Sequence, residues 1–202
     1  SLRGLGYSTA TALADVIDNS IAAHATQIDV SFDWRRELST ITILDNGDGM
    51  NAQALDLAMR LEEKSPLDER ASDDLGRFGL GLKTASFSQC RCLTVASKAG
   101  GGIDCLRWDL DLLLANNNDG WLLLEGPAEG SAEKLDVLET REKGTLVLWE
   151  RLDRIITAGY REQDFLDLID RVERHLAMVF HRFIAGPRPR LRLYINGRQV
   201  SP

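Results

Sequence analysis

The sequence predicts an α/β domain in which helices pack on a sheet, and two kinds of residue pattern carry that prediction. Short segments rich in β-branched and alternating apolar residues predict strands at residues 28–34, 40–45, 93–96, 103–108, 121–124, 144–149 and 191–195. Other segments predict helices at residues 9–23, 52–60 and 165–183. The chain has 202 residues, which is enough for one domain with a substantial core.

The composition limits the classes of protein that the chain can represent. With 44% apolar residues and five prolines, it fits one globular domain, which we expect over residues 1–185, followed at 186–202 by a last strand and the start of a transducer-like region. The net charge of −7 disfavours non-specific binding to nucleic acid or to an anionic membrane. The longest apolar stretches are far shorter than a bilayer span, and the three cysteines lack zinc-ligand spacing. These features predict a cytoplasmic protein without a membrane segment.

The first predicted helix, residues 9–23, carries a polar pair on an otherwise apolar segment. Its apolar residues recur every four positions, and Ser8 stands where an N-cap residue is expected. Asp15 and Asn19 are four residues apart and therefore share one face of the helix. Burying a carboxylate and a carboxamide without partners is costly. The pair therefore marks either a ligand site or a polar stripe that faces water.

The strand at 40–45, which we expect to pair with 28–34 as a hairpin, leads into an acidic turn. Asp45 stands at the end of this strand, which is a rigid position for a carboxylate. Gly47 and Gly49 follow at alternate positions, where the missing Cβ atoms would let the backbone approach a flat ligand. The pattern indicates either a planar heterocycle held by Asp45 or an ordinary acidic turn. A calcium loop is excluded, because Gly47 stands where an EF-hand needs an oxygen ligand.

Residues 61–75 are highly charged and poor in large apolar side chains, and we expect them to form a mobile lid. The lid leads into the densest glycine cluster of the chain, at residues 76–86, and then into a helix. Such a turn is an anion site, because free N–H groups and the positive end of the helix point at the ligand. The cluster is neither a dinucleotide fingerprint nor a Walker A loop, since Leu82 stands where Walker A needs lysine. It predicts a phosphate-binding loop of another kind.

The second half of the chain contributes the remaining strands and a long helix. Residues 144–149 are apolar on both faces, which predicts a central strand with the Thr145 hydroxyl at its start. Residues 126–136 predict a polar surface loop, and the helix at 165–183 should pack on the sheet with its histidines in structural roles. Four arginines near a final hairpin form either a solvated face or a local nucleic-acid contact: Arg188, Arg190, Arg192 and Arg198.

Three of these signals occur in one order along the chain. They are Asp15-x-x-x-Asn19 on a helix, Asp45-x-Gly47-x-Gly49 after a strand, and Gly76-x-x-Gly79-x-Gly81 at the start of another helix. Together they resemble the N, G1 and G2 boxes of the GHKL ATPases, the superfamily of gyrase B, the Hsp90 chaperones, histidine kinases and MutL. The resemblance covers nearly the whole chain, because Gly144-Thr145 is similar to the family's Gly-Thr strand start. The glycine cluster looks most similar to MORC-type and bacterial Hsp90-like members.

The resemblance implies a Bergerat α/β sandwich of two layers, in which a mixed, largely antiparallel sheet has helices on one face and ATP lies beneath a lid. In the family pattern Asp45 would bind the adenine amino group, Asn19 would ligate Mg²⁺, and Asp15 would be the general base. Lys83 is either a phosphate partner or a solvent-facing residue. The nucleotide-binding residues implied are Asn19, Asp45, Gly47, Gly49, Met50, Gly76, Phe78, Gly79, Gly81, Lys83 and Thr145.

Two positions depart from the family pattern. Its gyrase and Hsp90 branches usually have glutamate where Asp15 stands, and a carboxylate one methylene shorter is expected to miss the water by about 1 Å, which costs on the order of 10²-fold in rate. The family also often has aspartate where Ala22 stands. Three functions stay open at this stage: a slow Mg²⁺-dependent ATPase whose lid closure dimerises two copies, a nucleotide-binding switch without significant hydrolysis, and a histidine-kinase-type catalytic domain.

Overall fold

The structure is a computed structural model that describes residues 7–60, 81–115 and 123–202. Its helical elements are α1 (Thr9–Ala22), η1 (Arg36–Leu38), α2 (Ala52–Met59), α4 (Leu110–Ala115), η2 (Ala132–Leu138), α5 (Glu162–Val179) and α6 (His181–Ile184), and residues 81–87 are also helical. Its strands are β1 (Gln27–Asp33), β2 (Thr40–Asp45), β3 (Cys92–Ala99), β4 (Ile103–Asp109), β5 (Leu124–Glu125), β6 (Lys143–Glu150), β7 (Arg192–Ile195) and β8 (Arg198–Gln199).

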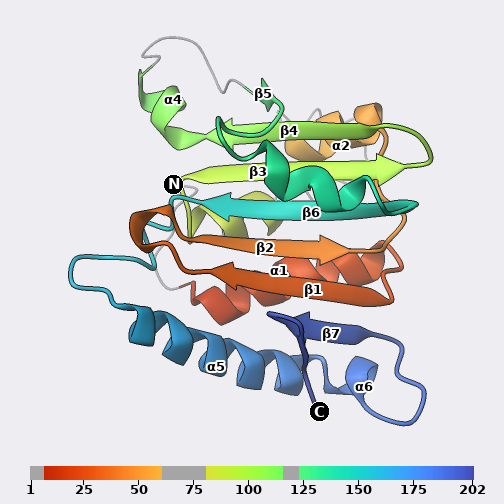
Figure 1. Cartoon of the computed structure of the whole chain (residues 1–202). Helices are drawn as coiled ribbons and strands as arrows, with labels where there is room; N and C mark the ends of the chain where they lie inside the picture. The colour runs from red at the N-terminus through yellow and green to blue at the C-terminus, as the bar shows by residue number, and fades with distance from the viewer. Residues whose placement is uncertain (1–6, 61–80, 116–122) are drawn as a thin grey trace, which may run out of the picture.

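The strands form one sheet in the order β5-β4-β3-β6-β2-β1-β7-β8 (Figure 1). Neighbouring strands are antiparallel except β1 and β7, which are parallel. The predicted hairpin of β1 and β2 is therefore confirmed, and so is the central position of β6. The mixed, largely antiparallel sheet confirms the predicted fold class.

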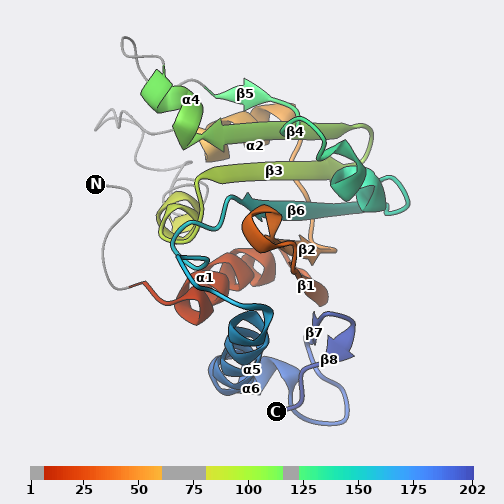
Figure 2. The same cartoon turned by 60° about the vertical axis from the view of Figure 1, so that its left-hand side comes forward.

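Helices cover one face of the sheet, and Figures 1 and 2 show α1, α2 and α5 on that side. Alternate residues of the strands point at them, such as Ile41 and Ile43 of β2 and Trp149 of β6, which are at most 1% exposed. This is the period of two that a half-buried strand requires. The layer of helices therefore buries the main core, and the ends of the strands below α1 are placed rigidly.

The opposite face carries a smaller apolar cluster that the sequence did not reveal. Leu44, Leu146 and Leu148 point to this side, where Leu135 and Leu138 of η2 cover them. The prediction of a polar surface loop at 126–136 is wrong in its second half, because a strand that is apolar on both faces needs cover on both faces. Figure 1 shows η2 in front of β6 and β3.

The C-terminal part of the fold differs from the prediction at one point. The helix expected over 165–183 ends at Val179, and Phe180 interrupts it with φ −101° and ψ 18° before the short α6. The Phe180 side chain is 1% exposed. The chain turns here so that this ring stays in the core.

The hairpin predicted at Asn196-Gly197 is confirmed. Both residues have positive φ, 47° and 77°, as a two-residue turn between strands requires. The hairpin places β7 against β1 and β8 against β7, so residues 192–199 extend the same sheet. The domain boundary near residue 185 stays a prediction.

Candidate functional site

Three side chains at one level of the sheet form the base of the site, and we call them the polar rung: Asp45, Thr145 and Ser97. Asp45 of β2 pairs with Thr145 of β6, and Thr145 pairs with Ser97 of β3, so three neighbouring strands place a polar side chain at the same level. The hydroxyls of Ser97 and Thr145 lie 2.8 Å apart, and the Met50 backbone N–H donates to the Ser97 hydroxyl at 2.8 Å. The polar rung therefore joins the loop after β2 to the start of β6.

Asp45 is 5% exposed and has a partner on each carboxylate oxygen. Its Oδ1 accepts from the backbone N–H groups of Gly47 at 2.9 Å and Thr145 at 3.2 Å, and its Oδ2 accepts from the Ser20 hydroxyl at 2.7 Å. Burial raises the pKa of Asp45, and these three hydrogen bonds act against the rise because they stabilise the charged form. The carboxylate is thus fixed in orientation by its protein partners.

Counting acceptor sites shows what Asp45 has left to offer. A carboxylate has about four lone-pair sites, and the described residues fill three of them. The remaining site is on Oδ2, beside the Ser20 hydroxyl. Because an ionised carboxylate only accepts, this site suits an N–H donor such as an exocyclic amino group and not a carbonyl.

The glycines around Asp45 allow the backbone segments to approach one another closely. A Cβ on Gly47 would lie 2.8 Å from the carbonyl oxygen of Ala23, and one on Gly49, where φ is +72°, would lie 2.1 Å from that of Lys98. Gly144 has φ +146°, and a Cβ there would lie 2.2 Å from the Asp45 carbonyl oxygen. These contacts make glycine necessary for the loop's packing. Contact of Gly47 or Gly49 with a ligand stays a prediction.

Helix α1 carries the predicted polar pair, Asp15 and Asn19, beside the polar rung. The Ser8 hydroxyl caps the helix by accepting from the Thr11 N–H at 3.1 Å, as predicted. Asp15 and Asn19 are both half-buried, and the next residue, Ser20, holds Asp45. The helix therefore leads from Asp15 through Asn19 to the buried carboxylate.

The Asn19 carboxamide is the least satisfied group of the site. Its Nδ2 is buried and has no hydrogen-bond partner among the described residues. Leaving such a donor unpaired costs about 1–3 kcal/mol, so a native structure keeps one mostly where a ligand, ion or water completes it. This position therefore favours the ligand-site interpretation of the pair over a simple water-facing stripe.

Lys83 does not face solvent. Its side chain is 2% exposed, and its ammonium group donates to the carbonyl oxygen of Arg60, at the C-terminal end of α2. That placement is favourable, because the last carbonyl groups of a helix lack intrahelical partners and attract a cation. The solvent-facing alternative is thus wrong, whereas contact with a phosphate stays a prediction.

The glycine cluster is described only from Gly81 onward. A Cβ on Gly81 would have no neighbour within 4 Å among the described residues, so their packing does not require a glycine there. The other predicted phosphate-loop residues, Gly76, Phe78 and Gly79, and the predicted lid at 61–75 lie outside the described residues. Their roles stay predictions.

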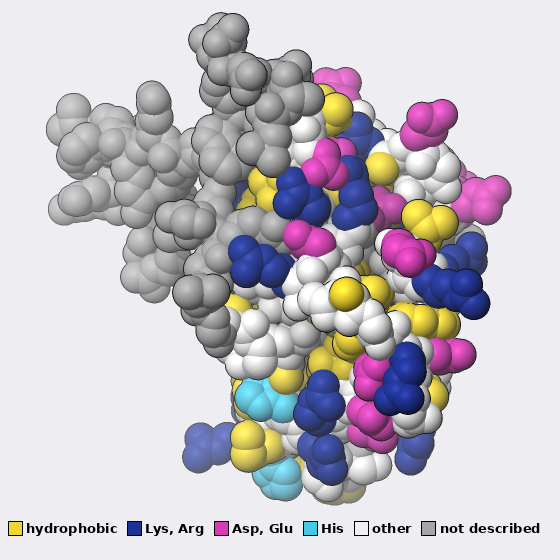
Figure 3. All heavy atoms as spheres, turned by 90° about the vertical axis from the view of Figure 1, so that its left-hand side faces the viewer, with side chains coloured by type: hydrophobic (Ala, Val, Ile, Leu, Met, Phe, Trp, Pro, Cys, Tyr) yellow, Lys and Arg dark blue, Asp and Glu magenta, His cyan; other side chains and the backbone are white. Residues whose placement is uncertain are grey.

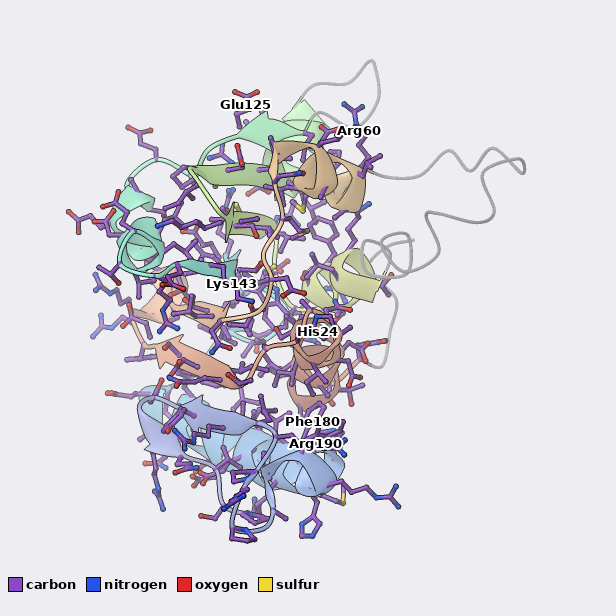
Figure 4. All side chains as sticks on the ribbon, turned by 90° about the vertical axis from the view of Figure 1, so that its right-hand side faces the viewer. His24, Arg60, Glu125, Lys143, Phe180 and Arg190 are labelled. Atoms are coloured by element: carbon purple, nitrogen blue, oxygen red, sulfur yellow. The ribbon has the colours of Figure 1, made fainter. Side chains whose placement is uncertain are left out.

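A charged rim surrounds the loop after β2. The carboxylate of Asp48 lies 2.6 Å from His24 Nδ1 and 3.1 Å from Lys143 Nζ. His24 follows α1 and Lys143 begins β6 (Figure 4). These partners hold the pKa of Asp48 below its ordinary value. The side chains are largely exposed, so the rim contributes little to stability.

Sequence reasoning missed two residues of the site, Ser20 and Ser97. A serine next to Asn19 on the helix carried no spacing signal, since residues i and i+1 point in different directions. Ser97 becomes relevant through its register with Thr145 in a strand that lies far away in the sequence.

Across residues 7–60, 81–115 and 123–202, no three His, Cys, Asp or Glu side chains gather as a metal site. In the same ranges, no helix is long and apolar enough to cross a bilayer. The predicted metal ligand, Asn19, is an amide whose oxygen could contribute to a site only together with other oxygen donors.

The mixed, largely antiparallel sheet with helices on one face is the α/β sandwich of the GHKL type. A family model described as histidine kinase-, DNA gyrase B- and HSP90-like ATPase matches residues 7–145. The chain therefore belongs to this family, and it contains its ATPase domain.

A curated relative supports the MORC-type resemblance. ATPase MORC2B of Mus musculus is 33% identical over 98 residues, which cover 47% of this chain and 10% of the relative. The matching segment thus spans about a tenth of that protein.

Proposed function

We propose that the chain binds ATP together with Mg²⁺ and hydrolyses it slowly to ADP and phosphate. The arrangement of α1 over the polar rung supports this most strongly: Asp45 keeps one acceptor site, Asn19 keeps one unpartnered amide, and Asp15 lies one turn further along the same face. An adenine at Asp45 would direct the phosphates along α1 towards Asp15. The half-buried Met50 would line the base pocket.

The residues present fit Mg²⁺ bound with a nucleotide. Mg²⁺ prefers oxygen ligands, keeps several waters and is usually held through few protein groups plus phosphates. The Asn19 side-chain oxygen would be such a ligand. Its buried Nδ2 is a donor, which a nucleotide oxygen or a water would complete and the ion would not. When bound, the ion would neutralise charge on the phosphates.

Asp15 is the proposed general base. Its carboxylate is half-buried, and Oδ1 accepts no hydrogen bond from the described residues. It is therefore able to orient and deprotonate a water. Because hydrolysis of this kind depends mainly on positioning and charge stabilisation, the shorter aspartate predicts a slow enzyme.

Three variants of α1 test this proposal. Asp15→Ala should lower kcat by about 10²–10⁴-fold with ATP affinity nearly unchanged, since the base acts on water. Asn19→Ala should instead weaken Mg·ATP binding. Asp18→Ala is the matched control, because Asp18 lies on the same helix and is exposed. Steady-state phosphate release and isothermal titration separate the three.

A nucleotide switch is the competing function, and one observation favours it. Oδ2 of Asp15 already accepts the Tyr7 hydroxyl at 2.5 Å, so the carboxylate is partly engaged before any water binds. A wild-type rate equal to that of Asp15→Ala, with tight ATP binding in both, would establish the switch and exclude the enzyme.

ATP-dependent lid closure and dimerisation complete the proposal. They rest on the sequence pattern of 61–75 and on the family resemblance, and the lid lies outside the described residues. Analytical ultracentrifugation with and without a non-hydrolysable ATP analogue tests dimerisation. A monomer under both conditions would contradict it.

A second proposed property is local binding of nucleic acid at the C-terminal end of the fold. Residues 174–202 hold six arginines and no Asp or Glu, in a chain of net charge −7. All six are exposed, and none pairs with a carboxylate among the described residues. Figure 3 shows Lys and Arg side chains around the lower end of the molecule, and Figure 4 places Arg190 there.

Salt dependence tests this surface. If Arg190 and Arg192 bind phosphates, replacing both by alanine should weaken binding of duplex DNA. The plot of log affinity against log salt concentration should become less steep, by about 0.9 for each phosphate that is no longer neutralised. Arg35→Ala, which removes an exposed arginine of the β1–β2 connection paired with Asp33, is the control. An unchanged slope would contradict the proposal.

A further inference from the structure

The N-terminal end of the described chain makes a specific contact with the proposed base. The hydroxyl of Tyr7 donates to Oδ2 of Asp15 at 2.5 Å, across eight positions of sequence. Tyr7 directly precedes Ser8, the N-cap residue of α1, and Asp15 lies within that helix. The hydrogen bond to Asp15, helped by partial burial, raises the pKa of Tyr7, so the phenol keeps its proton and remains a donor.

A buried glutamine fixes the backbone of Tyr7. Gln89 is 3% exposed, and its Nε2 donates to the Tyr7 carbonyl oxygen at 3.0 Å while its Oε1 accepts from the Thr9 hydroxyl at 2.6 Å. Gln89 follows the helix at 81–87, which begins at Gly81, the last glycine of the cluster. The position of Tyr7 is therefore set from the helix that follows the predicted phosphate loop.

The two oxygens of Asp15 have different surroundings. Oδ2 is held by Tyr7, whereas Oδ1 accepts no bond from the described residues. An aspartate on a helix can otherwise exchange between staggered χ1 states. A hydrogen bond on one oxygen selects one of these states and leaves the other oxygen without a donor among the described residues.

We propose that Tyr7 is a positioning residue for catalysis, which holds the Asp15 carboxylate so that Oδ1 is presented to the attacking water. This inference rests on the proposed function and adds a residue outside the three sequence motifs. It also addresses the short side chain of Asp15, because a base with reduced reach depends more on a fixed orientation. Gln89 supports this arrangement by fixing the Tyr7 backbone through a hydrogen bond to its carbonyl oxygen.

A double-mutant cycle with Tyr7→Phe and Asp15→Ala tests the inference. Tyr7→Phe keeps the ring and removes the hydroxyl, and it should lower kcat by about three- to tenfold while KM and ATP affinity stay unchanged, because the orientation of the base is lost and the binding groups are not touched. In the Asp15→Ala background the same change should have no effect, since its target is gone. Tyr194→Phe, on β7, is the matched control and should match the wild type.

The outcomes separate the inference from the proposed function. A wild-type rate equal to that of Asp15→Ala overturns both. If Asp15→Ala is slow but Tyr7→Phe turns over as fast as wild type or faster, the positioning role is wrong and the general base stands. A decrease in kcat of Tyr7→Phe that persists in the double variant, or that comes with a raised KM, also overturns it, because the hydroxyl would then act elsewhere.

Discussion

Replacing Asp45 by asparagine tests the site at its most constrained residue. Oδ1 accepts two backbone N–H groups, so the amide oxygen of asparagine must take that place and its NH₂ group must take the place of Oδ2. That NH₂ group would face the adenine amino group, donor against donor. The missing hydrogen bond and the buried unpaired donor cost about 1–3 kcal/mol. Because 1.4 kcal/mol is a factor of ten, ATP affinity should fall about 5- to 150-fold.

The same substitution should change the choice of base. The carbonyl oxygen of guanine can accept from the new NH₂ group, so GTP should lose little affinity and the preference for ATP should narrow. The Ser20 hydroxyl can rotate to accept from the amide, so the fold should survive. Asp48→Asn is the matched control, because Asp48 lies three residues later and pairs outward with His24 and Lys143.

Isothermal titration of ATP and GTP against the wild type and both variants measures the effect. The reasoning is refuted if Asp45→Asn binds ATP as the wild type does, if the wild type binds GTP as tightly as ATP, or if Asp48→Asn weakens ATP binding equally. Circular dichroism of the variants controls for loss of fold.

The remaining predictions concern stability and rate. Burial raises the pKa of Asp45, so the folded state binds a proton at this carboxylate more tightly than the unfolded chain does. Stability therefore falls as the pH rises from the ordinary pKa of 3.8 through the folded pKa. On acidification through that range the Tm of the wild type should rise relative to that of Asp45→Asn, and a constant difference in Tm would contradict this prediction. Gly49→Ala should lower the free energy of unfolding in urea by more than about 3 kcal/mol, because its Cβ would meet the carbonyl oxygen of Lys98. Gly100→Ala, at φ +86° with no described atom near its Cβ, should lower the free energy of unfolding by only about 1 kcal/mol. Asp15→Glu should raise kcat in phosphate-release assays if reach limits the rate, and a lower kcat would show that the site is built for the shorter side chain. Ser97→Ala should weaken ATP binding measurably by calorimetry, since the Met50 N–H loses its acceptor; unchanged affinity would remove Ser97 from the site.

Local patterns predicted those parts of the fold that local physics decides. The period of two in β1 and β2 and the doubly apolar β6 gave strands in the right places, and Ser8 marked the start of α1. The errors occurred where tertiary packing decided. Leu135 and Leu138 lie in a stretch of polar composition and are buried because the far face of the sheet needs cover. Phe180 ends α5 because its ring packs in the core, which helical periodicity alone could not show.

The candidate site divides in the same way. Asp45 was found because a carboxylate at a strand end stands out in sequence, and Asn19 because it shares a helical face with Asp15. Ser20 and Ser97 were not found, since each matters through a partner that is distant in sequence: 25 residues separate Ser20 from Asp45, and 48 separate Ser97 from Thr145. Serine in a helix or strand gives no local signal of burial.

Strand β6 shows why the site depends on the whole fold. It follows β3 and β4 in the sequence, yet it inserts between β2 and β3, and so places Thr145 between Asp45 and Ser97. Gly144 allows that approach, because any side chain at φ +146° there would meet the Asp45 carbonyl. A slip of β6 by one residue would turn Thr145 to the other face of the sheet and bring an apolar side chain or none opposite Asp45. The carboxylate would then lose a backbone donor while remaining buried. Burial of the apolar residues on both faces of β6 therefore fixes the register on which the polar rung depends.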